Sequence, residues 1–232
     1  MAATRVQTKS GNAGSYTESC AITWGSNTTT GNTIIVIIGV DQSDKDVISV
    51  TDSQSNTYTR IHTGAGSSNG AEYFMYYAYN ITGGTTPTIT VNITAGNFQD
   101  IVVLAREYSG LTTTDPLDVN TFTSEGSYLQ THTSGTTGST TTANQLVVMG
   151  MVADAKTPTY SAGSGYSNLS SQGGFDLYLS VAVQDKDITS TGTQSGSFST
   201  TSFTKGAVGI ATFKEASAPA SGSSRLTLLG VG

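Results

Sequence analysis

One apolar run that occurs twice constrains the fold of this chain more than any other feature. Residues 28–40 read TTTGNTIIVIIGV, and residues 140–152 read TTTANQLVVMGMV, at a constant offset of 112 (140 − 28). The offset continues back without a gap to Tyr16 and Tyr128 (128 − 16). A β-branched apolar run of this length, bounded by turn residues, is typical of a fully buried strand. The sequence therefore predicts two related halves, each built around one buried strand.

The strands that follow are repeated in the same order. Residues 71–80 are matched by residues 175–184 at an offset of 104, and residues 100–108 are matched by residues 206–214. No segment has the 3.6-residue periodicity of a helix. We expect a β-sandwich over residues 1–214, with half-repeats at about 1–110 and 119–214. A linker and an apolar C-terminal peptide are expected over residues 215–232.

Composition supports an all-β fold. Only 11% of the residues are charged, and low charge combined with many β-branched residues and regular turn signals indicates a sandwich and argues against disorder. We expect a jelly-roll-like antiparallel β-sandwich built from two quasi-repeated halves, with a flexible C-terminal tail. The halves could form two tandem sandwiches or interleave in one sandwich. Interleaving is preferred because five predicted strands per half hardly cover both sheets of an independent sandwich.

Charge and terminal sequence exclude several classes of partner. The net charge of −6 argues against a nucleic-acid partner, which leaves a basic footprint. No apolar run approaches the length of a membrane span. The N-terminus has no apolar region of a secretory signal, so we expect a protein made and kept in a cytosol. The single Cys20 excludes an internal disulfide, and its apolar neighbours favour a small buried residue over a nucleophile.

The sequence contains no recognisable catalytic motif, cofactor motif or metal motif. Asp41, Asp44 and Asp46, with Asp52, could supply oxygen ligands to Ca²⁺. Their spacing matches no EF-hand, however, and Lys45 interrupts them, so a solvated acidic loop is the preferred interpretation.

Carboxylates on predicted strands offer the one route to hydrolytic chemistry. Glu72 and Glu107 could form a glycosidase pair if they faced one cleft. Strand-end carboxylates at a sheet edge are commoner. The only two histidines, His62 and His132, lie in unrelated Thr-rich contexts. We therefore expect no catalytic residue, no cofactor and no metal.

The aromatic strand suggests a surface for a partner. In the second copy Leu179, Val181 and Val183 are expected to point inward, and transferring that phase by 104 sends Tyr73, Met75, Tyr77 and Tyr79 inward. Phe74 and Tyr76 then lie on the opposite face. Exposed aromatic side chains on a sheet mark a protein interface or a sugar platform. The alternative is that an arm or loop of the same chain covers this face.

The C-terminal peptide is the second expected contact. Residues 215–224, EASAPASGSS, form a flexible linker, after which apolar residues return at Leu226, Leu228, Leu229 and Val231. Alternation at Leu226 and Leu228 suits addition as a strand to the sheet edge of a neighbouring subunit. A frayed terminus is the alternative.

The order of several strand and turn signatures carries a family resemblance. VTDSQSNTYTR, YYAYNITGG, IVVLAREYSGLTTTDPLDV, TTTANQLVV and AGSGYSN follow one another within residues 16–214. In this the chain resembles a jelly-roll-like repeat domain of bacterial surface proteins and of structural proteins of tailed-bacteriophage virions. Surface members usually carry signal peptides and long tandem arrays, which are not seen here, so the virion class is favoured. The family has no catalytic residues to carry over.

The resemblance implies a function in assembly. It implies a virion structural protein made in the host cytoplasm, either a capsid decoration (cement) protein or a tail-associated protein. The partners would be the major capsid protein or a tail protein, together with further copies of the chain in a homo-oligomer. A carbohydrate-binding or adhesive module on a phage tail or bacterial surface is the alternative, and a hydrolase is the least favoured class.

Overall fold

The computed structural model describes residues 2–14, 17–41, 46–62, 70–95, 100–156, 158–175 and 179–217, and every regular element in them is a β-strand. The strands are β1 (Thr4–Ala13), β2 (Ser19–Thr23), β3 (Thr33–Asp41), β4 (Val47–Asp52), β5 (Thr59–His62), β6 (Ala71–Ala78), β7 (Thr88–Ile93), β8 (Ile101–Ser109), β9 (Leu117–Thr133), β10 (Gln145–Ala153), β11 (Tyr160–Ala162), β12 (Ser167–Gly173), β13 (Ser180–Ile188) and β14 (Ser197–Lys214). All strand pairs are antiparallel. The predicted all-β sandwich of two quasi-repeated halves is confirmed.

The first half forms two sheets with the connectivity of a jelly roll. Their orders are β1-β8-β3-β6-β5 and β2-β7-β4. A jelly roll has eight strands in two sheets, and here β5 lies beside β6 at the edge of the larger sheet. The two sheets enclose an apolar core that contains Ile22, Ile34, Val36, Ile38, Phe74, Tyr76, Val91 and Val103. We call this the outer core of the first half.

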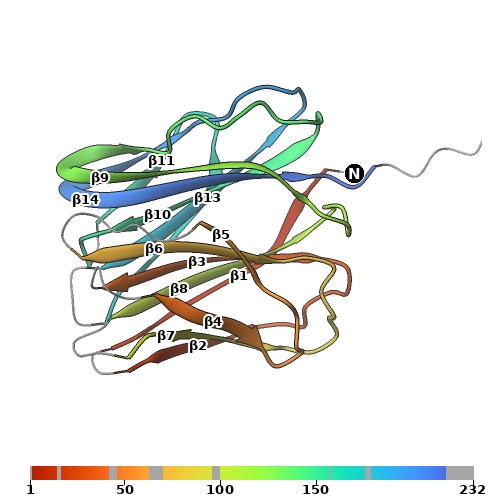
Figure 1. Cartoon of the computed structure of the whole chain (residues 1–232), viewed down its shortest axis with the longest axis horizontal. Coiled ribbons are helices and arrows are strands. Elements are labelled where there is room, and N and C mark those ends of the chain that lie inside the picture. Colours follow the sequence, from red (N-terminus) through yellow and green to blue (C-terminus); the bar gives the residue numbers. More distant parts are fainter. Residues whose placement is uncertain are drawn as a thin grey trace, which may run out of the picture.

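The second half forms one six-stranded sheet, with the order β11-β14-β10-β13-β12 and with β9 paired to β14 (Figure 1). The C-terminal part of β14 pairs with β10 and with the start of β9, whereas its N-terminal part pairs with β11 and with the end of β9. β9 and β14 therefore each run through two layers of the second half: one that contains β10 and one that contains β11. The outer core of the second half lies between these layers and contains Val147, Met149, Met151, Tyr160, Tyr166, Phe198, Val208 and Ile210.

The halves pack against each other through the larger sheet of the first half and the sheet of the second half (Figure 1). β8 lies against β13, β6 against β14, and β3 against β10, while β1 lies near β12 and β5 near β9. Because each contact has a counterpart with the halves exchanged, the halves are related by a pseudo-two-fold. The central core between them contains Ile35, Ile37, Tyr73, Met75, Leu104, Leu146, Val148, Val181, Val183 and Phe213.

The expected interleaving of the halves is not observed among the described strands. No strand of one half joins a sheet of the other there; the single bridge between Leu111 and Glu215 lies outside the named strands. Five strands per half was too low a count: the first half has eight strands, β1 to β8, which form both sheets of a sandwich by themselves. The halves are instead joined face to face through the central core.

Glycines allow the central sheets to approach closely. A Cβ on Gly39 would lie 2.9 Å from methyl groups of Val152 and Val181. A Cβ on Gly150 would lie 2.7 Å from Ile37 Cδ1. These distances are shorter than side-chain packing permits, so an alanine at either position would force the sheets apart.

The core residues predicted from the apolar runs are buried, as expected. Ile34, Val36, Ile38, Leu146 and Val148 are at most 3% exposed. Truncation of Val36 or Val148 to alanine should lower the free energy of unfolding by about 2 kcal/mol, measured by urea denaturation. Val6→Ala is the control, since that side chain is 46% exposed and should change stability by less than about 0.5 kcal/mol. Equal losses at Val6 and Val36 would contradict this assignment of the core.

Candidate functional site

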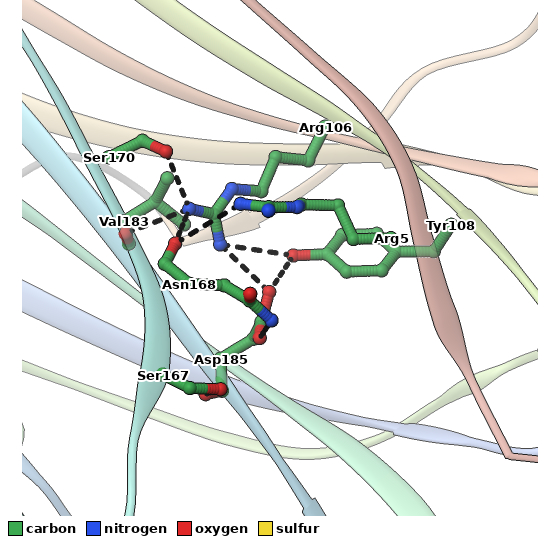
Figure 2. Close-up of polar contacts among 8 residues, drawn as sticks. All are labelled: Arg5, Arg106, Tyr108, Ser167, Asn168, Ser170, Val183 and Asp185. Carbon is green, nitrogen blue, oxygen red and sulfur yellow. Dashed lines mark hydrogen bonds and ion pairs between the residues drawn. The ribbon is translucent and has the colours of Figure 1, made fainter.

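A buried ion pair joins the two halves (Figure 2). Arg106 on β8 places Nη1 2.8 Å from Oδ2 of Asp185 on β13, and the two side chains are only 1% and 4% exposed. The hydroxyl of Tyr108 donates to the same carboxylate oxygen at 2.8 Å. A buried charge needs such a partner, because removing it from water costs several kcal/mol.

Further hydrogen bonds connect Arg106 and Asp185 to β12 and β13, whereas the buried Nε of Arg106 has no hydrogen-bond partner among the described residues (Figure 2). Nη2 of Arg106 donates to Ser170 Oγ at 3.0 Å, to the Val183 carbonyl at 3.1 Å and to the Asn168 carbonyl. The amide of Asn168 donates to Oδ1 of Asp185 at 2.6 Å. Both carboxylate oxygens of Asp185 therefore already accept hydrogen bonds from the protein. We interpret this network as a structural link between β8, β12 and β13 and not as a reaction centre.

The pseudo-two-fold places a different cluster at the equivalent position. Arg106 and Tyr77 flank Ile35 on β3, whereas Ala211 and Asp185 flank Val148 on β10. The equivalent of the ion pair is therefore apolar, and there the ring of Tyr77 meets Phe213 edge-on at 5.8 Å. One side of the central core is held by charges and the other by aromatic rings.

The two strand carboxylates considered for glycoside hydrolysis do not form a pair. Glu107 lies opposite Ile34 and Glu72 opposite Val40. Six residues of strand separate these positions, about 20 Å, whereas a glycosidase pair stands roughly 5–9.5 Å apart. Glu107 is fully buried and accepts hydrogen bonds from Gln7 Nε2, from the Asn32 side chain and from the Thr29 amide at 2.6–2.8 Å.

One histidine forms an arrangement that resembles a catalytic triad but is sealed. His132 Nδ1 lies 2.5 Å from Glu125 Oε2, and Nε2 lies 2.9 Å from Thr204 Oγ1. A nucleophilic hydroxyl must reach its substrate, yet the side chains of His132 and Thr204 are fully buried. The contact with Glu125 instead links two parts of β9, and the bond to Thr204 connects β9 to β14 where the two strands bend.

The acidic loop is described only in part. Asp44 lies outside the described residues, whereas Asp46 forms an ion pair with Arg60 at 2.6 Å. Asp52 accepts hydrogen bonds from the Gln54 amide and the Tyr58 hydroxyl at 2.9 and 3.0 Å. Within the described ranges no group of three His, Cys, Asp or Glu side chains could hold a metal ion.

Thermal melting tests the expected lack of a calcium site. The melting temperature should be the same in EDTA and in excess Ca²⁺, since a bound ion would stabilise the folded state by mass action. Mg²⁺ at the same concentration controls for ionic strength. A rise of many degrees with Ca²⁺ alone would identify the loop over residues 41–46 as a metal site.

Phe74 and Tyr76 are core residues and not a surface for a partner. The transferred phase is correct for β6, since Tyr73 and Met75 face the central core and Phe74 and Tyr76 face the other way. It is wrong for Tyr79, which lies just beyond the end of β6 and is 40% exposed. That opposite face, however, is covered by the sheet β2-β7-β4, which leaves the two rings 1% and 6% exposed. Arg60 also packs over both rings at 5.3 and 5.4 Å. The expected contact with another chain is therefore corrected here.

Exposed apolar side chains gather where β9 and β14 bend. Tyr128, Leu129 and Phe203 are 55%, 37% and 66% exposed. Leu129 pairs with Thr204 across the two strands, and Lys205 Nζ lies 5.0 Å from the Tyr128 ring centroid. We call Tyr128, Leu129, Phe203 and Lys205 the aromatic corner. Transferring the inward and outward alternation from one half to the other could not identify the aromatic corner, because these residues lie at bulges, where strand alternation is interrupted.

A groove of about 570 Å³ lies where the described chain ends. Its walls come from both halves and from the connection between them: Ala2, Thr112, Thr114, Thr142, Ala143, Asn144, Asp187, Ile188, Thr189, Lys214, Glu215, Ala216 and Ser217. The predicted contact residues Leu226, Leu228, Leu229 and Val231 lie outside the described residues. We call this cavity the exit groove.

Comparison of the chain with protein-family models, with curated proteins and with solved structures found no match. Among the described residues there is also no helix long and apolar enough to cross a membrane. What can be said of function therefore follows from the side chains and surfaces described above.

Proposed function

We propose that the protein is a structural component of a bacteriophage particle, specifically a capsid decoration (cement) protein that stabilises the shell through protein–protein contacts. The observation that supports this is how the interior charges are used. Arg106, Asp185, Glu107 and His132 all bond to neighbouring strands or loops, so each contributes to holding the sheets together. A body whose buried charges hold neighbouring strands together suits a protein whose work is to bind other subunits.

The partners in this proposal are the major capsid protein, or a tail protein, and further copies of the chain. The protein would be made in the host cytoplasm and end in the virion. Its C-terminal peptide, with Leu226, Leu228, Leu229 and Val231, is the proposed contact with a neighbouring subunit in the particle, and the aromatic corner is a second exposed surface for such contacts.

Purified particles provide the test. Mass spectrometry should find the chain in a fixed copy number per particle, and particles lacking it should release their DNA at a lower temperature. Deletion of residues 225–232 should weaken the incorporation of the chain into particles. Particles that contain none of the chain, or that are equally stable without it, would refute the proposal.

A carbohydrate-binding or adhesive role is the second candidate, and the aromatic corner favours it. Lys205 places its Nζ over the Tyr128 ring, and the exposed residues around Tyr128 and Phe203 are uncharged, namely Gly126, Ser127, Gln130 and Ser202. Aromatic faces among neutral hydroxyl and amide groups suit a sugar. Tyr128→Ala with Phe203→Ala should abolish binding to host-surface polysaccharide in a pull-down, whereas Tyr79→Ala, a 40% exposed ring elsewhere, should not. Unchanged binding by the double variant would exclude this surface.

A further inference from the structure

The exit groove combines apolar and acidic surface. Ile188, Ala143 and Ala216 supply apolar wall, while Asp187 and Glu215 place two carboxylates on it. Burial, the nearby Glu215 and Asp185 together raise the pKa of Asp187. Lys214 is the one cation in the lining. The groove therefore fits a short apolar peptide that also carries a positive charge.

The chain carries such a peptide immediately beyond the groove. Ser217 is the last described residue and itself forms part of the groove wall. Seven residues, 218–224, separate it from Arg225, which is followed by Leu226 and Leu228. Arg225 is also the only cation between Ser217 and the end of the sequence given. A volume of 570 Å³ lies within the range of sites that bury small ligands, which is enough for a few residues of this peptide.

The anchoring of the chain end keeps this peptide near the groove. The Ala216 amide donates to the Gly110 carbonyl at 2.8 Å, and Glu215 bridges to Leu111. The chain is thus held against the connection between the halves up to Ala216, one residue before the last described residue, Ser217. Seven linking residues span at most about 24 Å, and a short flexible linker gives an effective concentration in the millimolar range. At micromolar protein, the chain's own peptide outcompetes that of another copy.

We propose that residues 225–232 dock in the exit groove of the same chain when the protein is free, with Arg225 beside Asp187 and Glu215 and the leucines against Ile188. This contact goes beyond the proposed function and does not depend on it. It stores an apolar segment that would otherwise be exposed to nonspecific association.

Disulfide trapping in the full-length chain tests the proposal. Thr189 lines the groove and is exposed, so a Thr189→Cys, Leu228→Cys variant should form an intramolecular disulfide under mild oxidation, at a rate independent of protein concentration. The native Cys20 can remain, because burial and the nearby Asp100 raise the pKa of its thiol to about 12. Thr51→Cys with Leu228→Cys is the matched control, since Thr51 is exposed on β4, in the outer sheet of the other half.

The charge contact has its own test. Arg225→Glu in the Thr189→Cys, Leu228→Cys background should slow trapping about fivefold, the equivalent of about 1 kcal/mol, and Arg225→Lys should change it little. Equal trapping rates at Thr189 and Thr51, or no effect of Arg225→Glu, would overturn the proposal. Disulfides found only between chains would also overturn it, whatever the outcome of the particle experiments.

Discussion

Asp185→Ala should lower the free energy of unfolding by roughly 3–5 kcal/mol, the largest effect expected of a single substitution in this protein. The variant leaves the Arg106 guanidinium buried between the halves without its counter-charge, and it also removes the acceptor of the Tyr108 hydroxyl. Urea denaturation followed by tryptophan fluorescence measures the loss. Asp46→Ala is the control: its ion pair with Arg60 is partly exposed and should contribute less than about 1 kcal/mol. Similar losses in both variants would contradict the role of the buried pair.

The residues at the symmetry-related positions of the other half suggest a replacement for the buried network of Arg106, Tyr108 and Asp185. A triple variant, Arg106→Ala with Tyr108→Phe and Asp185→Tyr, copies the residues at the equivalent positions of the other half, Ala211, Phe213 and Tyr77. It should recover most of the stability lost in Asp185→Ala, because well-packed apolar groups often replace a buried ion pair without a net cost. A triple variant as unstable as Asp185→Ala would show that the two sides of the central core are not interchangeable.

Acidification from pH 7 to pH 4 should reduce stability through His62, by roughly 3 kcal/mol. This side chain is 6% exposed, and burial lowers its pKa from 6.5 to about 4, with a hydrogen bond to the Ile210 backbone opposing part of the shift. Below pH 6.5 the unfolded chain binds a proton that the folded chain does not. The contribution of His62 is therefore complete above pH 6.5 and is lost as the pH falls towards 4.

A variant separates His62 from the carboxylates that titrate in the same range. The imidazole packs against Tyr73 and Phe122, with ring centroids 6.1 and 5.8 Å away, so His62→Phe should fit this aromatic cluster. Its stability should fall less steeply than that of the wild type between pH 6.5 and 4 in urea denaturation. Parallel curves for the two proteins would contradict the prediction.

The sequence showed the repeat, but it did not show which residues of the two halves occupy equivalent positions. The sequence offset of 112 pairs Ile34 with Leu146, yet Ile34 faces the outer core of the first half and Leu146 faces the central core. The left-handed residues that precede the two strands, Gly31 and Asn144, correspond at 113 (144 − 31), and this offset matches the faces. A shift of one residue exchanges the faces of a strand. In a strand buried on both sides the apolar pattern does not reveal that shift.

The candidate surfaces show a similar limit. Alternation placed Phe74 and Tyr76 correctly on the face opposite Tyr73, but the sheet that covers them is built from β2, β4 and β7, whose pairing depends on long-range contacts. The buried ion pair left one readable signal, since Arg106 follows the apolar run over residues 101–105 within the same strand and a buried charge must be paired. Its partner Asp185 lies 79 residues away, and the repeat offers no guide because the equivalent residues are apolar.

The strands β9 and β14, which each contribute to both layers of the second half, also set the order in which a nascent chain can fold. All eight strands of the first half have been synthesised once Ser109 has left the ribosome, so this sandwich can close early. The second half must wait for β14, the last strand, because β14 contributes to both of its layers. During that interval the five-stranded sheet of the first half presents Ile35, Ile37 and Leu104 to water. Synthesis of β14 thus ends the period in which these apolar side chains are open to association with other polypeptides.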